Sequence, residues 1–193
     1  MKKVERAELL GFAEYEPLRE HFRQRVIASK RVRRVELGRH MSLVFENHDT
    51  VLLQIQEMLR TERISDERAI AHEIDTYNEL IPPPGGLCAT MFIEYDDPAQ
   101  RKVMLEKFAT LREQLHLWIG ARKTTARFTT HFGEELERLP AVNYLSFQVG
   151  EDAGAALRDA STRASFEIDH PDYKVALDLT PALREELARD LDS

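Results

Sequence analysis

Residues 82–95, PPPGGLCATMFIEY, place the strongest helix breaker of the chain directly before a long apolar run. Three prolines remove three backbone amide donors and two glycines relax the backbone, so residues 82–86 are expected to form a loop. Residues 87–95 have little polar interruption, which predicts a strand that is buried on both faces. We treat 1–193 as a single domain with a sub-structure boundary at the loop 82–86.

Two amphipathic helices are predicted just before this loop. The first begins after a cap at Asn47 or Asp49, and the second begins after a cap at Ser65. Each has an apolar stripe at helical spacing, formed by Val51, Leu52, Ile55, Met58 and Leu59 in the first helix and by Ile70, Ile74, Tyr77 and Ile81 in the second. The two helices are therefore expected to pack as neighbours.

A helix and a hairpin are predicted nearer the N-terminus. Pro17 suits the first position of a helix over residues 17–30, in which Leu18, Phe22 and Val26 recur every four residues. Residues 32–37 and 41–46 are β-prone runs on either side of a three-residue loop. Met41, Leu43 and Phe45 alternate, so one side of the second run is expected to face a core.

The second half of the chain predicts mainly strands. Asp97-Pro98 starts a helix to about residue 108, residues 115–119 and 124–129 suggest a hairpin, and Pro181 begins a helix over 181–191. Three further strands have alternating apolar residues around Phe147, Phe166 and Leu177. The expected fold class is α+β, a largely antiparallel sheet with β-hairpins, covered by several amphipathic helices.

Composition excludes several classes of protein. No apolar stretch approaches the ~20 residues of a membrane helix, and no secretory signal is visible, so we expect a cytoplasmic protein. The single cysteine, Cys88, excludes an internal disulfide and a cysteine zinc or iron–sulfur site made by this chain alone. The common hydrolase, NTPase and dinucleotide-binding motifs are absent. Any reaction or cofactor remains unknown at this point.

Charge is distributed unevenly along the chain. Residues 1–39 carry eleven Lys and Arg against six Asp and Glu, whereas the whole chain has a net charge of −7. The densest part is Lys30-Arg31-Val32-Arg33-Arg34, which could meet nucleic acid, an acidic partner or the acidic remainder of the same molecule. Nucleic acid is the least favoured of these, because no aromatic residues interleave the cluster and no recognition motif is present.

The predicted helix pair carries the side chains best suited to binding or catalysis. On the first helix, Glu57 and Arg60 lie opposite the apolar stripe and favour a surface ion pair, while Leu53 suggests that this face is partly covered. Gln54 and Gln56 flank the stripe and could bind a ligand or satisfy backbone groups. On the second helix, His72, Asp75 and Glu79 share a face that suits metal ligands or, more simply, solvent.

Several stretches together resemble a bacterial family, domain of unknown function 3501. The resemblance covers essentially the whole chain and is densest over residues 25–95. It is carried by Leu43-Val44-Phe45-Glu46-Asn47, by Gln54-Ile55-Gln56-Glu57-Met58 and by Asp75-Thr76-Tyr77-Asn78-Glu79-Leu80-Ile81-Pro82. Genes of this family often lie beside those for a rubrerythrin-like di-iron protein and an iron–sulfur oxidoreductase. The resemblance therefore implies an accessory role in redox or peroxide defence.

Two hypotheses follow, from different functional classes. In the first, a basic surface around Arg31, Arg33 and Arg34 docks an acidic redox partner or the acidic part of a second copy. In the second, the chain is an enzyme that binds a metal or small ligand between the paired helices and the hairpin. A carboxylate would then bind metal or move a proton and Arg60 would hold an anion, in a site formed by Glu57, Arg60, Glu73, Tyr77 and Glu79.

Overall fold

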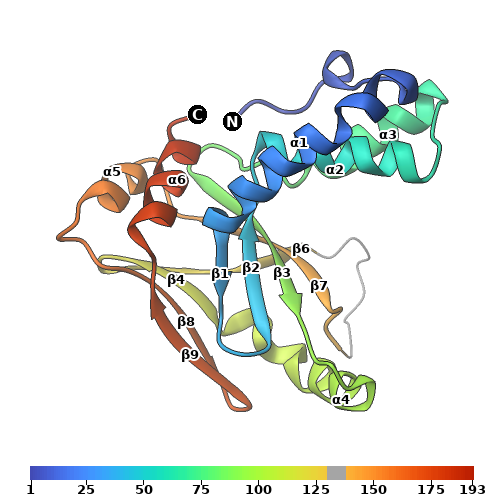
Figure 1. Cartoon of the computed structure of the whole chain (residues 1–193). Coiled ribbons are helices and arrows are strands. Elements are labelled where there is room, and N and C mark those ends of the chain that lie inside the picture. Colours follow the sequence, from blue (N-terminus) through green and yellow to red (C-terminus); the bar gives the residue numbers. More distant parts are fainter. Residues whose placement is uncertain (130–137) are drawn as a thin grey trace.

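Two antiparallel sheets pack against each other in the computed structural model, which describes residues 1–129 and 138–193 (Figure 1). The first sheet has the order β1-β2-β3-β7-β6, with β1 (Arg34–Glu36), β2 (Met41–Phe45), β3 (Gly86–Ile93), β7 (Val142–Gln148) and β6 (Arg127–Thr129). The second has the order β5-β4-β8-β9, with β5 (Arg122–Thr125), β4 (Leu115–Ile119), β8 (Ala164–His170) and β9 (Tyr173–Asp178).

Helices cover the ends of these sheets in the described ranges. They are α1 (Phe12–Arg33), α2 (His48–Thr61), α3 (Glu67–Asn78), α4 (Pro98–Lys107), α5 (Ala153–Arg158) and α6 (Pro181–Leu191), with short 3-10 helices η1 (Arg6–Glu8) and η2 (Phe108–Glu113). The predicted α+β class is confirmed, and α6 has the predicted ends. No helix of the described ranges is long and apolar enough to cross a membrane.

Aromatic rings join the two sheets at the centre of the core. Phe45 and Phe147 come from the first sheet and Phe166 from the second, with ring centroids 6.0 Å apart for Phe45 and Phe166 and 5.8 Å apart for Phe147 and Phe166. The predicted alternation along β2 is confirmed, since Met41, Leu43 and Phe45 of β2 face this core as predicted and are at most 1% exposed, while the other side of the strand, Ser42 and Val44, is buried as well. The predicted burial of β3 on both faces is also confirmed.

The predicted antiparallel strands divide into two sheets. The strand around Phe147 pairs with β3 in the first sheet, whereas β8 and β9 pair with each other in the second. The expected return strand over 124–129 splits at Ala126, because β5 pairs with β4 and β6 pairs with β7. Apolar alternation identifies the buried face of a strand but not the strand beside it, so the division into two sheets could not be predicted from it.

Helices α1, α2 and α3 form a lobe at one end of the molecule, here called the helical lobe (Figure 1). The predicted cap of α2 is confirmed at Asn47, whose side chain accepts a hydrogen bond from the Thr50 amide. Asp66, not Ser65, caps α3, because its carboxylate accepts from the amides of Arg68 and Ala69. The predicted packing of α2 on α3 is confirmed by a buried cluster that includes Val51, Ile55, Leu59, Ile70 and Ile74.

Helix α1 is longer and less covered than the sequence predicted. It begins at Phe12, so Pro17 lies inside it and not at its first position. Its buried residues are Tyr15, Val26 and Arg33, whereas Leu18 of the predicted apolar stripe is 55% exposed. Pro17 is the sixth residue of α1, so its missing amide removes one helical hydrogen bond, the one to the Ala13 carbonyl.

The first eleven residues form an arm across α2 and α3. Two buried side-chain amides hold its backbone: Asn78 bonds both the N–H and the C=O of Val4, and Gln56 bonds both groups of Leu10, all at 2.9 Å. Because each amide satisfies a donor and an acceptor that would otherwise be buried without partners, the arm is fixed at two points.

Candidate functional site

Glu57 is on α2, and both oxygens of its carboxylate accept hydrogen bonds from side chains of α1. Arg19 donates two hydrogen bonds of 2.8 Å to this carboxylate, and the Tyr15 hydroxyl donates a third of 2.6 Å. These contacts, the Arg19 bond first, hold the pKa of Glu57 below its ordinary value despite partial burial. The covering suggested by Leu53 is therefore real, but it comes with a lowered pKa, which does not suit a proton shuttle near neutral pH.

Arg60 does not pair with Glu57, so the predicted surface pair within α2 is wrong. Its guanidinium instead binds the Glu16 carboxylate of α1 at 2.7 and 3.0 Å. Gln56 forms hydrogen bonds with the backbone of Leu10, so it satisfies backbone groups, which is one of the two roles predicted for it. Gln54 is half-buried on the same helix. Long-range partners on α1 thus replace the local pairing that helical spacing favours.

The remaining residues of the helix-pair hypothesis lie on α3 or just after it, whereas Glu57 lies on α2. Glu73 is half-buried on α3, Tyr77 packs on the α2–α3 cluster, and Glu79 is exposed just after α3. His72 and Asp75 are exposed as well. Among the described residues there is no group of three or more His, Cys, Asp or Glu side chains arranged to hold a metal ion.

Cys88 lies in β3 beside the buried carboxylate of Glu46. Burial, and then the charge of Glu46, raise the pKa of the Cys88 thiol to about 12. Glu46 itself accepts hydrogen bonds from the hydroxyls of Thr50 and Thr90 at 2.5 and 2.6 Å. A thiol with such a pKa is not a nucleophile at neutral pH, and the group holds α2 on the first sheet.

The basic cluster at the end of α1 is divided between the interior and the surface. Arg33 is 2% exposed and binds Asp190 of α6 through two contacts of 2.7 Å, with Glu186 at 3.2 Å. The expectation that Arg33 belongs to a docking surface is wrong, because the acidic remainder of the chain neutralises it internally. Arg34 bonds the Ser42 hydroxyl at 2.7 Å, and Arg31 is exposed.

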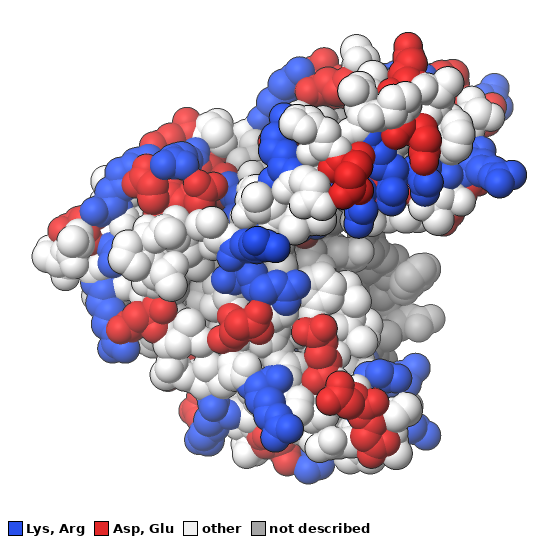
Figure 2. Space-filling model, in the orientation of Figure 1, with Lys and Arg blue, Asp and Glu red and all other residues white. Residues whose placement is uncertain are grey.

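Exposed apolar side chains gather on α1, a feature that the sequence pattern did not reveal. Large exposed apolar residues in the described ranges are Leu10, Phe12, Leu18, Val32, Val103 and Val142, and the first four lie on α1 or directly before it. On the face drawn in Figure 2, Lys and Arg side chains lie near the C-terminal end of α1. The helix therefore presents both apolar and cationic groups to solvent.

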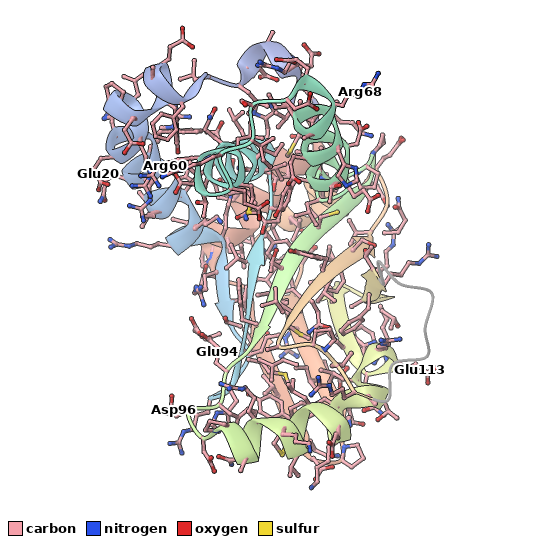
Figure 3. The ribbon with its side chains drawn as sticks, turned by 90° about the vertical axis from the view of Figure 1, so that its right-hand side faces the viewer. Glu20, Arg60, Arg68, Glu94, Asp96 and Glu113 are labelled. Atoms are coloured by element: carbon pink, nitrogen blue, oxygen red, sulfur yellow. The ribbon has the colours of Figure 1, made fainter. Side chains whose placement is uncertain are left out.

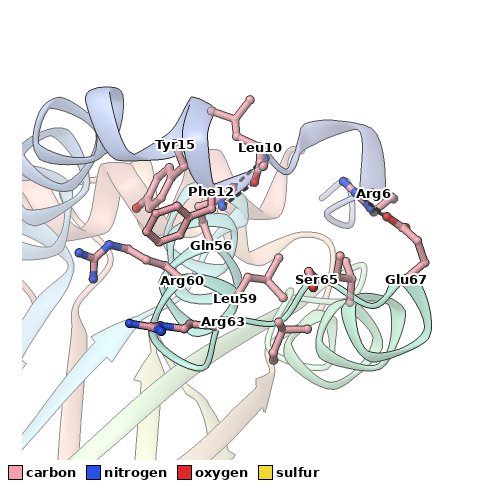
Figure 4. A pocket seen from close by; sticks show the side chains of 13 residues that line it. Arg6, Leu10, Phe12, Tyr15, Gln56, Leu59, Arg60, Arg63, Ser65 and Glu67 are labelled. Atoms are coloured by element: carbon pink, nitrogen blue, oxygen red, sulfur yellow. Dashed lines mark hydrogen bonds and ion pairs between the residues drawn. The ribbon is translucent and has the colours of Figure 1, made fainter.

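A pocket of about 480 Å³ lies between the arm, the start of α1 and the junction of α2 with α3 (Figure 4). Leu59 and Ile70 form an apolar floor, and Phe12, 61% exposed, stands at its mouth. Three arginines, Arg6, Arg60 and Arg63, also line it. Of these, only Arg60 was a sequence candidate, because Arg6 is brought here by the arm and Arg63 follows the end of α2.

Arg63 lies at the end of α2 in a strained backbone conformation. Its φ is +55°, and the Ile64 amide closes the helix end by bonding the Leu59 carbonyl at 2.9 Å. Glycine is the usual residue here, since the left-handed region costs other residues about 1–2 kcal/mol. Backbone strain of this kind is concentrated at functional sites in proteins generally, and Arg63 lines the pocket.

Glu57→Ala is expected to lower the free energy of unfolding by about 2 kcal/mol, because Arg19 and the buried Tyr15 hydroxyl both lose their acceptor. With a folded-state pKa below the unfolded one, Glu57 stabilises the fold above the unfolded pKa of about 4.3 and ceases to do so as the pH falls through the folded value. The measurement is urea unfolding of both proteins across this pH range.

Glu20→Ala is the control for this variant, because Glu20 is exposed on α1, the helix that carries Tyr15 and Arg19, and should change stability by less than about 0.5 kcal/mol. Equal losses for the two variants, or a loss from Glu57→Ala that does not shrink in acid, contradict the assignment.

Comparison with known proteins identifies the family of the chain. A search of curated proteins finds no match. A crystal structure from Burkholderia pseudomallei K96243, described as a novel protein of unknown function, is 34% identical, with a TM-score of 0.92 over 99% of this chain and 100% of that one. The family model for proteins of unknown function DUF3501 matches residues 3–191. The chain therefore belongs to the DUF3501 family.

Proposed function

We propose that this protein is an accessory protein that docks an acidic protein partner along the outer face of α1. The observation that carries this proposal is the concentration of exposed apolar side chains on that one helix. Helices normally bury their apolar residues against the core, and exposed patches that combine apolar groups with arginine are typical of interaction surfaces.

Three apolar residues of α1, two of them exposed and Phe22 half-buried, share one side of the helix. Leu18, Phe22 and Val32, here called the docking stripe, are spaced by four and ten residues, which places them within about 80° of one another around the helix axis. Arg25 lies between them, with its guanidinium 5.0 Å from the centre of the Phe22 ring. The stripe spans about 21 Å, a length suited to a groove or helix of another protein.

Charge favours an acidic partner over a neutral one. Arg25 lies within the stripe and is 58% exposed along the side chain, with a single acidic contact at 3.4 Å. Arg31 is exposed near the C-terminal end of α1, about 100° around the helix from Val32. The family resemblance points to a rubrerythrin-like di-iron protein or an iron–sulfur oxidoreductase as the partner. Association driven partly by these charges should weaken as salt rises.

The test is direct binding of the purified chain to each of these two redox proteins from the same organism. Leu18→Glu and Arg25→Glu should each weaken binding at least tenfold, which corresponds to about 1.4 kcal/mol. Val103→Glu is the matched control, because Val103 is 50% exposed on α4 at the far end of the molecule (Figure 1). Binding unaffected by the α1 variants, association only between copies of this chain, or no binding, would each contradict the proposal.

An enzyme that works through Glu57, Glu73 and Glu79 is the second candidate. One observation favours it: Gln56 and Arg60 of the same helix pair line a pocket. The three carboxylates do not line that pocket, and Glu57 is held by Arg19 and Tyr15. Metal content of the oxygen-free purified protein, compared with a Glu57→Ala, Glu79→Ala double variant, decides it, because bound metal lost in the variant would support the enzyme.

A further inference from the structure

Three arginines line the pocket beneath the arm, and two of them are paired with a carboxylate. Arg6 donates hydrogen bonds of 2.9 and 2.8 Å to the Glu67 carboxylate, and Arg60 donates hydrogen bonds of 2.7 and 3.0 Å to the Glu16 carboxylate. Arg63 has no acidic partner among the residues that the structure describes. The lining therefore has one positive charge that nothing in this part of the chain neutralises.

Figure 4 shows how these groups are arranged around the pocket. The side chains of Arg60 and Arg63 extend in the same direction from the end of α2, below the rings of Phe12 and Tyr15, while the Arg6–Glu67 pair lies at the other side. Both paired arginines already bind a carboxylate through two nitrogens. The Arg63 guanidinium suits a planar carboxylate in the same way, because a guanidinium binds a carboxylate with two parallel hydrogen bonds.

The rest of the pocket suits an apolar body attached to that anion. Leu59 and Ile70 are 7% and 5% exposed at its floor, and the Phe12 ring is left largely open to solvent at its mouth. The polar atoms of Gln56, which also lines the pocket, are occupied by the arm backbone. A volume of about 480 Å³ is in the range of small-molecule sites.

We propose that this pocket binds a small amphiphilic monocarboxylate, with its carboxylate on Arg63 and its aliphatic or aromatic part between Phe12 and the Leu59–Ile70 floor. A single unbalanced arginine fits one negative charge better than the two of a phosphate monoester. The strained backbone of Arg63 is consistent with this role, because a glycine there would close the helix with less strain but would offer the ligand no charge.

The experiment compares probes that share one tail and differ in the head group. Octanoate, octyl phosphate, octylamine and octanol are titrated into the whole chain by calorimetry, with acetate as a head group alone and 4-phenylbutyrate as an aromatic analogue. We expect octanoate or phenylbutyrate to bind at least tenfold more tightly than the amine, the alcohol, the phosphate and acetate. Equal or tighter binding of any of these four, or no binding at all, overturns the proposal.

Arg63→Gly distinguishes a loss of ligand binding from a loss of folding. It removes the charge and the backbone strain together, so the midpoint of denaturant unfolding should rise while the affinity for octanoate falls at least tenfold. Phe12→Ala should weaken octanoate at least threefold and leave the stability nearly unchanged, since Phe12 is exposed.

Arg68→Ala is the matched control, because Arg68 is exposed on α3 away from Arg60 (Figure 3) and does not line the pocket. Leu18→Glu, the docking variant, should also leave octanoate binding unchanged, which separates this proposal from the docking proposal. Octanoate affinity that is unchanged in Arg63→Gly, or reduced equally in Arg68→Ala, overturns the assignment.

Discussion

Arg33→Met is expected to lower the free energy of unfolding by about 3–5 kcal/mol, the largest loss we expect from any single polar side chain in this protein. Arg33 joins the end of α1 to α6 and is 2% exposed, with both terminal nitrogens on Asp190 at 2.7 Å. Without it, the Asp190 carboxylate, 7% exposed, keeps only the weaker attraction of the N-terminal amine and is repelled by Glu186. An uncompensated buried charge costs more than the original pair contributes.

The loss should depend on pH in a defined direction. Burial already raises the pKa of Asp190 above its ordinary value, against the opposing effect of Arg33. In Arg33→Met this pKa should rise further, so the folded state binds the proton more tightly than the unfolded state. The destabilisation is then complete above the folded pKa and shrinks as the pH falls toward the unfolded value of about 3.9.

A double variant provides the control for this prediction. Replacing both partners, Arg33→Met with Asp190→Leu, removes the charge as well as its counterion and should recover most of the lost stability. Urea unfolding of the parent, the two single variants and the double variant completes the cycle. A double variant as unstable as Arg33→Met would show that packing, and not the unpaired carboxylate, causes the loss.

Local signals in the sequence identified most of the elements correctly. The apolar stripes of α2 and α3, the apolar run of β3 and the proline at the start of α6 each record a local requirement, either a buried face or a helix start. The start of α1 was missed because Pro17 is a good first residue for a helix, and nothing local shows that the chain is already helical five residues earlier.

The candidate site was harder to predict because its partners are distant in sequence. Glu57 and Arg60 are three residues apart, which favours a local pair, yet they bind Arg19 and Glu16, 38 and 44 residues away on α1. The pocket likewise depends on the arm, whose place is set by Asn78 and Gln56. The left-handed backbone at Arg63 has no signal in the sequence at all, since glycine would have been expected there.

Phe166→Ala is expected to lower the free energy of unfolding by about 3–5 kcal/mol, because it leaves a cavity at the joint between the two sheets. Phe166 is fully buried and lies within 6.0 Å of the rings of both Phe45 and Phe147. Val142→Ala is the control, because Val142 is 44% exposed at the start of β7 and its loss should cost less than about 0.5 kcal/mol.

The same variant tests whether residues 1–193 unfold as one unit. The single tryptophan, Trp118, reports on the second sheet, whereas far-ultraviolet circular dichroism reports strongly on the helices of the helical lobe. Because Arg33 and Asp190 join α1 of the helical lobe to α6, whose residues belong to the core of the sheets, we expect the two signals to change together in Phe166→Ala, with a midpoint shifted equally. A tryptophan transition that precedes the loss of helix would instead divide the chain into two units, with the loop 82–86 as their boundary.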